Sequence, residues 1–189
     1  MNGKNAYRDR LKQDLGGIID DLELSDLQKR FLHSRWLDQV LWMEGKADTC
    51  QFRYYALRLV AIIGGVIIPA LVSLNVRGAT ASVLVSWITF FLSLTVAISL
   101  AVEEFLRFGE RWRHYRRTVE ILKNDGWQFF QLSGPYTAHS SHQAAYPEFA
   151  AHVEGILQGE VDVYITQIMR ERKGKEEEQP AEPPSSGKS

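Results

Sequence analysis

Two uncharged stretches decide the fold: residues 59–74, LVAIIGGVIIPALVSL, and residues 78–102, GATASVLVSWITFFLSLTVAISLAV. At about 1.5 Å of rise per residue, a helix over 54–74 is roughly 31 Å long and one over 78–102 roughly 37 Å. The hydrocarbon core of a bilayer is about 30 Å thick, so each stretch is long enough to cross it. The sequence therefore predicts an all-α membrane protein with a two-span transmembrane helical hairpin.

The charges around these stretches predict how the hairpin is oriented. The turn between them, residues 75–78, carries one cation, Arg77. Because cytoplasmic flanks carry the excess of Lys and Arg, we expect both termini in the cytoplasm. The first 50 residues are charged throughout, without the apolar segment of a signal peptide. The cations of the outer flanks are Lys46, Arg53, Arg107, Arg111, Arg113, Arg116 and Arg117.

Outside the two stretches the pattern is that of long helices. Ser25 and Gln28 form a capping box that predicts a helix start, and we expect this helix to run on toward the first span. Apolar residues after the second span keep a spacing of four and three, which predicts one unbroken helix whose apolar seam continues into a cytoplasmic bundle. We expect the helix over 25–53 to be its antiparallel partner. The seam residues are Leu94, Ile98, Ala101, Phe105, Phe108, Trp112, Tyr115, Val119 and Leu122.

Prolines and a change of composition mark the end of the chain. Residues 133–147 are predicted to be a loop, and Pro147 with Glu148 suits the first turn of a final helix. The complete set of expected segments is N-terminal cytoplasmic helices (1–53), a first transmembrane helix (54–74), an extracytoplasmic turn (75–78), a second transmembrane helix (79–102), a cytoplasmic helical region (103–172) and a disordered tail (173–189).

The residue types that carry catalysis or bind cofactors do not gather in this sequence. A net charge of −1 gives no reason to expect a nucleic-acid partner. His139 and His142 have no Cys, Asp or Glu beside them to complete a metal site. Glu103 and Glu104 are adjacent, so on a helix they diverge by about 100° and do not converge on a substrate. We therefore expect no enzyme, no cofactor and no metal.

A stripe of hydroxyl residues follows one face of the second span. Ser82, Ser86, Thr89 and Ser93 step by four, three and four, and the stripe continues through Val96 and Leu100 to Glu103 and Arg107. One interpretation is packing, since small hydroxyl residues let helices approach closely. The other is a water-filled path in a homo-oligomer, lined by the four hydroxyl residues, gated by the two apolar residues and biased toward cations by the glutamate at its mouth, beside Arg107.

Pro69 interrupts the backbone hydrogen bonds of the first span and is predicted to kink it. Gly64 and Gly65 lie one turn earlier. A static kink and a hinge used in gating are both compatible with this pattern.

Several motifs resemble a bacterial family of two-span membrane proteins of unknown function, over roughly residues 8–170. The family itself resembles, more distantly, the SLATT proteins, two-helix membrane modules proposed to be pore-forming effectors. The resemblance implies an oligomeric channel or membrane-perturbing effector of the bacterial plasma (inner) membrane, with a trigger supplied by a cytoplasmic protein or a nucleotide. The motifs are RWLDQVLWME (35–44), YYALR (54–58), RWRHYRRT (111–118), GPY (134–136) and VEGIL (153–157).

Residues and resemblance together predict an oligomeric membrane pore or ion channel, cation-preferring, in contact with the lipid bilayer and with ions. The second span lines the path, and the cytoplasmic helices connect it to a trigger. The alternative is a membrane-anchored helical scaffold or interaction module without conductance.

Overall fold

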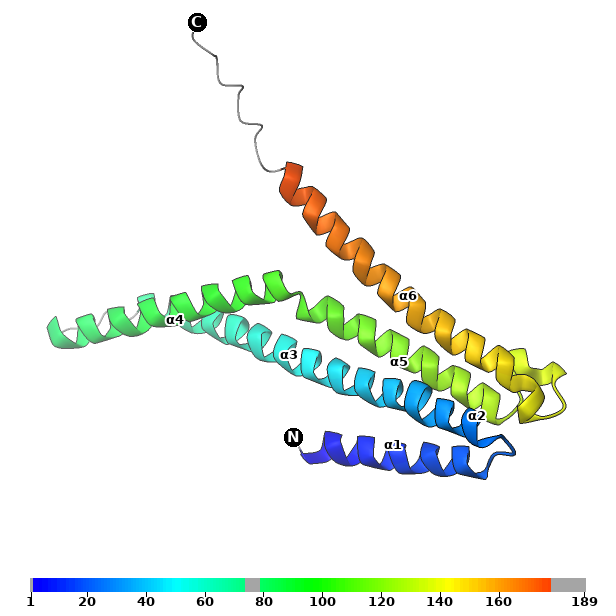
Figure 1. Ribbon diagram of the computed structural model, residues 1–189. Helices are drawn as coiled ribbons and strands as arrows, with labels where there is room; N and C mark the ends of the chain where they lie inside the picture. The colour runs from blue at the N-terminus through cyan, green and yellow to red at the C-terminus, as the bar shows by residue number, and fades with distance from the viewer. Residues whose placement is uncertain (1, 74–78, 178–189) are drawn as a thin grey trace, which may run out of the picture.

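The computed structural model describes residues 2–73 and 79–177, and the side chains at 2, 4, 5, 79 and 160–177 are not described. The described residues are almost entirely helical and contain no strand, which confirms the all-α class (Figure 1). The elements are α1 (Asn2–Asp21), α2 (Asp26–Phe31), the π-helical segment η1 (Leu32–Leu37), α3 (Asp38–Ser73), α4 (Ala79–Leu106), α5 (Phe108–Phe130), the 3₁₀ segment η2 (Gly134–Ala138) and α6 (His142–Glu177).

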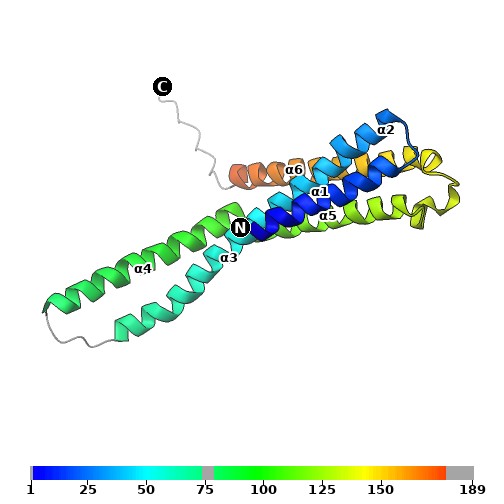
Figure 2. The ribbon, with the colours of Figure 1, turned by 90° about the horizontal axis from the view of Figure 1, so that it is seen from below.

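The molecule is elongated and has two parts. At one end, α4 lies beside the second half of α3, and these two helices project away from the rest (Figures 1 and 2). At the other end, the first half of α3 packs against α5, which in turn packs against α6, while α1 covers η1 and α3. We call this second part, α1 to the start of α3 together with α5 and α6, the bundle. The predicted turn at 75–78 lies outside the described residues.

The helix that enters the bundle begins at the predicted capping box. The backbone N–H of Ser25 donates to Oε1 of Gln28 at 2.9 Å, and the N–H of Gln28 donates to Oγ of Ser25 at 3.4 Å. From this start α2, η1 and α3 follow one another as one helical run of 48 residues, Asp26–Ser73. The expected helix start and its course toward the first apolar stretch are confirmed.

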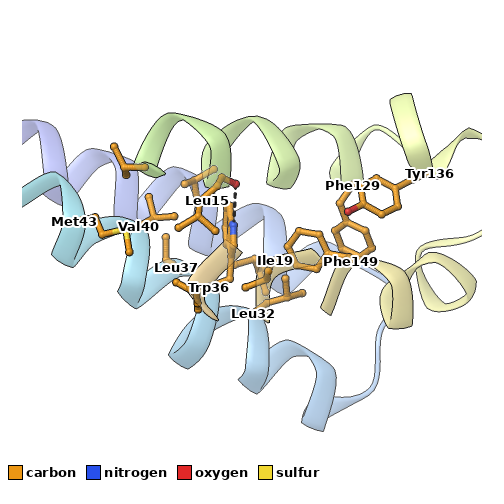
Figure 3. Packing of buried hydrophobic residues seen from close by; sticks show 14 of the residues in the cluster. Leu15, Ile19, Leu32, Trp36, Leu37, Val40, Met43, Phe129, Tyr136 and Phe149 are labelled. Atoms are coloured by element: carbon orange, nitrogen blue, oxygen red, sulfur yellow. Dashed lines mark hydrogen bonds between the residues drawn. The ribbon is translucent and has the colours of Figure 1, made fainter. Parts of the chain in front are cut away.

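The π-helical turn of η1 places Trp36 in the middle of the bundle. The indole is fully buried, and its Nε1 donates to the carbonyl oxygen of Leu122 on α5 at 3.0 Å (Figure 3, dashed line). The ring lies so close to Gly126 that a Cβ there would collide with it. Glycine at 126 is therefore what allows α5 to approach η1.

Apolar side chains from every helix of the bundle meet around this tryptophan. Phe129 and Phe149 stack with their centroids 4.4 Å apart, and Phe149 also meets the edge of Trp36 (Figure 3). The N-terminal residues, expected to be a short piece, form a helix that buries Leu15 and Ile19 in this core. The remaining core residues are Leu32, Leu37, Val40, Met43, Val119, Leu122, Tyr136, Ala145, Val153 and Leu157.

The prediction of one unbroken helix from the second apolar stretch into the bundle is wrong. Arg107 has a φ of 48° and a ψ of 44°, so α4 ends at Leu106 and α5 begins at Phe108. Because Arg107 is left-handed, α4 and α5 do not bury the same continuous face. Phe108, Val119 and Leu122 are buried as expected, whereas Ile98 and Phe105 of the same predicted seam are 53% and 82% exposed. The antiparallel partnership of α3 with α5 is confirmed.

The final helix begins before the predicted position. α6 starts at His142, where the Ser141 Oγ accepts a hydrogen bond from the N–H of Ala144 at 3.3 Å, and Pro147 falls in its second turn. The predicted loop is thus confined to the residues before 142 and contains η2. At its other end α6 continues past the expected boundary at 172 to Glu177, and the rest of the predicted tail, 178–189, lies outside the described residues.

Candidate functional site

Two helices are long and apolar enough to cross a membrane: the run Asp26–Ser73 and the segment Thr80–Leu106. In each, only 6% of the most apolar window is buried, whereas the core helix of a soluble protein is mostly buried. Their large apolar side chains therefore form an extended surface of the kind that soluble monomers rarely expose. The exposed residues include Ile62, Ile63, Val66, Val72, Val83, Leu84, Trp87, Ile88, Phe90, Phe91, Leu94 and Ile98.

One face of α4 packs against α3. Val96 lies directly over Gly64, so closely that a Cβ on residue 64 would overlap its Cγ2. Ser99, one turn further along α4, is 7% exposed. Half-buried residues continue this face at steps of four and three, namely Val85, Thr89, Leu92, Val96 and Glu103. We call these residues, with Ser99, the α3-facing seam of α4.

The predicted hydroxyl stripe lies beside this seam and partly overlaps it. Thr89, Val96 and Glu103 belong to the seam, which agrees with the packing interpretation for these residues. Ser82, Ser86 and Leu100 are exposed, and Ser93 is half-buried. At 100° per residue these four fall within about 40° of one another and roughly 75° from the centre of the seam. We call Ser82, Ser86, Ser93 and Leu100 the hydroxyl edge of α4.

The hydroxyl groups in this region donate to the backbone of their own helix. Ser86 Oγ donates to the carbonyl of Ser82 at 2.9 Å, and Ser93 Oγ donates to that of Thr89 at 2.8 Å. Thr89 Oγ1 donates to the carbonyl of Val85 at 2.8 Å. Such bonds lower the cost of placing a hydroxyl in lipid, and the oxygen still has a lone pair directed outward.

The two other predicted site residues lie at opposite ends of the spans. Pro69 is exposed in the last part of α3, which stays helical to Ser73. Arg107 is the left-handed residue between α4 and α5, and its Nη2 lies 3.1 Å from Oε1 of Glu110. The positive φ of Arg107 marks the place where the helix changes direction.

An aromatic cluster surrounds the junction of α4 and α5. The ring of Tyr54 stacks on that of Trp112 with their centroids 6.3 Å apart, and the centroid of the Tyr55 ring lies 5.8 Å from that of the same indole. Gly109 lies against Tyr54, so α5 begins in close contact with α3. Rings with one polar group each are typical of the interface between lipid and water.

A charged cluster fastens α3 to α5 inside the bundle. Glu44 is 2% exposed and accepts from Nη1 of Arg116 and from Nζ of Lys123, each at 2.8 Å. Glu120 contacts the same two cations at 3.0 and 2.9 Å. Burial lowers the pKa of Lys123, but its bonds to the two glutamates outweigh burial and raise it above the ordinary value. Lys123 is therefore charged at neutral pH.

A second polar cluster joins α5, η2 and α6. Tyr136 Oη donates to Oδ1 of Asp125 at 2.8 Å and lies 3.0 Å from Nδ1 of His152. The other carboxylate oxygen, Oδ2, is buried without a hydrogen-bond partner among the described residues. Burial raises the pKa of Asp125, which the tyrosine and the histidine only partly offset.

A bidentate ion pair attaches α6 to η1. Nε and Nη2 of Arg35 donate to the two carboxylate oxygens of Glu154 at 2.7 and 2.8 Å. These bonds lower the pKa of Glu154 below its ordinary value.

The sequence interpretation did not find these clusters, although some of their residues lie in the motifs of the resemblance. Glu44 gave one usable signal: it is a charge on the apolar stripe formed by Val40, Met43 and Ala47. A charge in such a position predicts a buried partner. Its partners are more than seventy residues away, so spacing along the chain does not reveal them.

The two histidines considered as metal ligands have separate partners. His139 Nε2 lies 2.8 Å from Glu148, and His142 Nε2 lies 3.0 Å from the carbonyl oxygen of Phe130. Among the described side chains, which are those of residues 3, 6–73 and 80–159, no three His, Cys, Asp or Glu come together as metal ligands.

The fold thus defines a class of all-helical proteins. In the described residues, two helices that are long and apolar enough to cross a membrane extend from a bundle whose helices are joined by ion pairs and hydrogen bonds. Residues 38–144 match the family model described as "Protein of unknown function (DUF4231)", and because this is more than half of the chain, the chain belongs to that family. The expected membership of a family of unknown function is confirmed. No curated protein and no solved structure matches the chain.

Proposed function

We propose that the chain is a multi-pass protein of a bacterial plasma membrane, with the second half of α3 and α4 as a transmembrane hairpin. The support is the apolar surface of these two helices, which is almost completely unburied. The distribution of Lys and Arg supports placing the bundle and both termini in the cytoplasm.

We further propose that copies of this chain form a homo-oligomeric pore or ion channel, as the resemblance to SLATT modules implies. The single observation that carries the proposal is the hydroxyl edge of α4. Ser82, Ser86 and Ser93 form a line of hydroxyl groups along one side of α4, offset from the seam that α3 occupies. In a ring of copies this edge faces the axis while α3 packs beside it.

The two apolar gate residues have different environments in this arrangement. Leu100 is 50% exposed at the end of the hydroxyl edge, so it is the constriction. Val96 packs on Gly64 and supports α4 from the side of the path. Glu103, one turn beyond Ser99, belongs to the α3-facing seam, so it acts on the mouth from beside the path, where it favours cations.

The bundle is the part that receives the trigger, either a cytoplasmic protein or a nucleotide. Arg107 is the single residue that connects α4 to α5. The charged cluster around Glu44 holds α5 to α3. A change in the bundle thus reaches α4 through this junction, and it reaches the second half of α3 along the continuous helix.

The test is current through planar bilayers that contain the purified full-length protein. We expect Leu100→Ser to raise the open probability, because a polar residue stays wet where leucine excludes water. The matched control is Leu94→Ser, the same change at a similarly exposed residue on another face of α4. Silent bilayers for both the native chain and Leu100→Ser, or equal effects of the two substitutions, contradict the proposal.

A scaffold or interaction module without conductance is the second candidate. The observation in its favour is Trp127, which is 44% exposed on the outer face of α5 and meets Phe130 edge-on. Exposed tryptophans are frequent anchors of protein interfaces. This function predicts a partner recovered by crosslinking through residues 130–147, lost in Trp127→Ala, together with silent bilayers.

A further inference from the structure

We propose that Arg53, Arg107 and Arg111, which we call the junction arginines, bind the phosphates of anionic lipids. The proposal rests on the membrane placement given above and is independent of conductance. It concerns a collar of contacts around the hairpin where the spans meet the bundle.

The junction arginines lie at one level along the molecule. The guanidinium of Arg53 lies over the ring of Phe108, 5.5 Å from its centroid, so this α3 residue is beside the first residue of α5. Arg107 precedes Phe108 directly, and Arg111 follows it within one turn. All three side chains are exposed.

That level is the edge of the apolar surface. The uncharged stretch of α4 ends at Val102, five residues or roughly 7 Å before Arg107. Along α3, Gly64 contacts Val96 of α4 and Tyr54 contacts Gly109 of α5. Gly64 and Tyr54 are ten residues apart, which is roughly 15 Å along the helix. The second contact belongs to the Tyr54–Trp112 cluster, whose residue types prefer the headgroup layer. The junction arginines therefore lie where lipid phosphates lie.

Two other arginines, Arg116 and Arg35, are held by carboxyl groups of the protein. Arg116 is bound by Glu44 and Glu120, and Arg35 forms its two-point contact with Glu154. Arg107 contacts Glu110 through Nη2. A guanidinium carries five N–H donors in a planar fork that fits a phosphate as well as a carboxylate, so the Arg107 contact with Glu110 is compatible with a phosphate on its other edge.

The same segment holds three carboxylates, Glu103, Glu104 and Glu110. Net charge alone therefore gives only weak attraction to an anionic surface. The proposal is one of direct guanidinium–phosphate contacts, and the affinity is expected to depend on which arginines are present more than on how many.

The experiment measures retention of phosphatidylglycerol by the full-length chain in nanodiscs that contain phosphatidylglycerol and phosphatidylcholine. We expect Arg107→Gln with Arg111→Gln to lower the preference for phosphatidylglycerol by about tenfold, and Arg53→Gln to lower it by a smaller factor. The matched control is Arg30→Gln with Arg117→Gln, an equal loss of charge on exposed residues far from the junction, because Arg30 is 23 residues before Arg53 on the same helical run. Arg117 is ten residues, roughly 15 Å, beyond Arg107, outside a headgroup layer about 5–8 Å thick.

Equal loss in the two double variants, or no loss in either, overturns the proposal. Inorganic phosphate titrated into phosphatidylcholine nanodiscs is expected not to bind, and binding that depends on the junction arginines overturns the assignment to lipid. Failure of the native chain to enter nanodiscs contradicts the membrane placement itself, whereas normal entry without a lipid preference contradicts only the present inference.

Discussion

Glu44 of α3 and Lys123 of α5 form a buried ion pair, with Nζ 2.8 Å from Oε1 and the glutamate 2% exposed. Arg116, two helical turns before Lys123 on α5, is the other α5 partner of this carboxylate. The pair sets how α5 is aligned along the first half of α3.

Replacing Glu44 by Gln leaves the mostly buried Lys123 and the exposed Arg116 with only the surface carboxyl group of Glu120 as a partner. We expect the free energy of unfolding of the bundle to fall by about 3 kcal/mol. Glu120→Gln is the control, because this half-exposed glutamate contacts the same cations at the surface, and its loss is expected to cost about 1 kcal/mol or less. Urea unfolding of the detergent-solubilised chain measures both, and equal destabilisation by the two variants contradicts the account.

Gly126→Ala tests the close approach of α5 to Trp36. The added Cβ collides with the buried indole, so we expect a loss of about 2 kcal/mol in stability. Gly155→Ala is the matched control on α6, where a Cβ meets nothing within 4 Å. In that position alanine is expected to be neutral or to stabilise by about 0.5 kcal/mol. Thermal unfolding of both variants checks the pair, and a stable Gly126→Ala would show that the glycine is dispensable.

Gly64→Ala tests the contact between α3 and α4. Its Cβ overlaps Val96, so we expect the variant to lower the thermal stability of the detergent-solubilised chain. Val96→Ala in the same chain removes the colliding methyl groups and is expected to restore part of the loss. Gly65→Ala, at the next residue, meets nothing within 4 Å and serves as the control. A loss in Gly65→Ala as large as in Gly64→Ala contradicts this packing.

The buried carboxyl group of Asp125 predicts a dependence of stability on pH. Its pKa in the folded chain is raised, so the folded state favours the neutral acid more than the unfolded chain does. Ionisation therefore costs stability as the pH rises from the ordinary pKa of about 3.9 through the raised value. We expect the stability of Asp125→Asn relative to the native chain to increase between pH 4 and pH 7. A difference that stays constant or decreases over this interval contradicts the assignment.

The sequence predicted those parts of the fold that short-range patterns determine. Ser25 and Gln28 mark a helix start because both partners of a capping box lie within one turn. The apolar length of residues 59–74 and 78–102 predicted two helices of spanning length without any knowledge of packing. The pairing of α3 with α5 was expected because the apolar seam after the second span needs a partner along its length and the helix over 25–53 can supply one.

The parts that were missed depend on single residues or on distant ones. The apolar steps of four and three pass through Arg107 without interruption, so the pattern contains no sign that this arginine is left-handed. Pro147 predicted the first turn of the final helix because proline suits that position, whereas α6 begins at His142, five residues earlier, with the Ser141 hydroxyl as its cap. Of the predicted path, Val96 and Thr89 turned out to belong to the α3-facing seam, since a stripe alone cannot distinguish packing from lining.

The central claim is that the hydroxyl edge of α4 lines a path for ions, and cysteine accessibility during conduction tests it most directly. The native Cys50 is buried and is replaced by Ser, after which Ser86→Cys or Ile98→Cys is introduced. We expect a positively charged, thiol-specific reagent to block the current of Ser86→Cys and to leave that of Ile98→Cys unchanged. Block at residue 98 with no effect at residue 86, or no current from any of these chains, would contradict the claim.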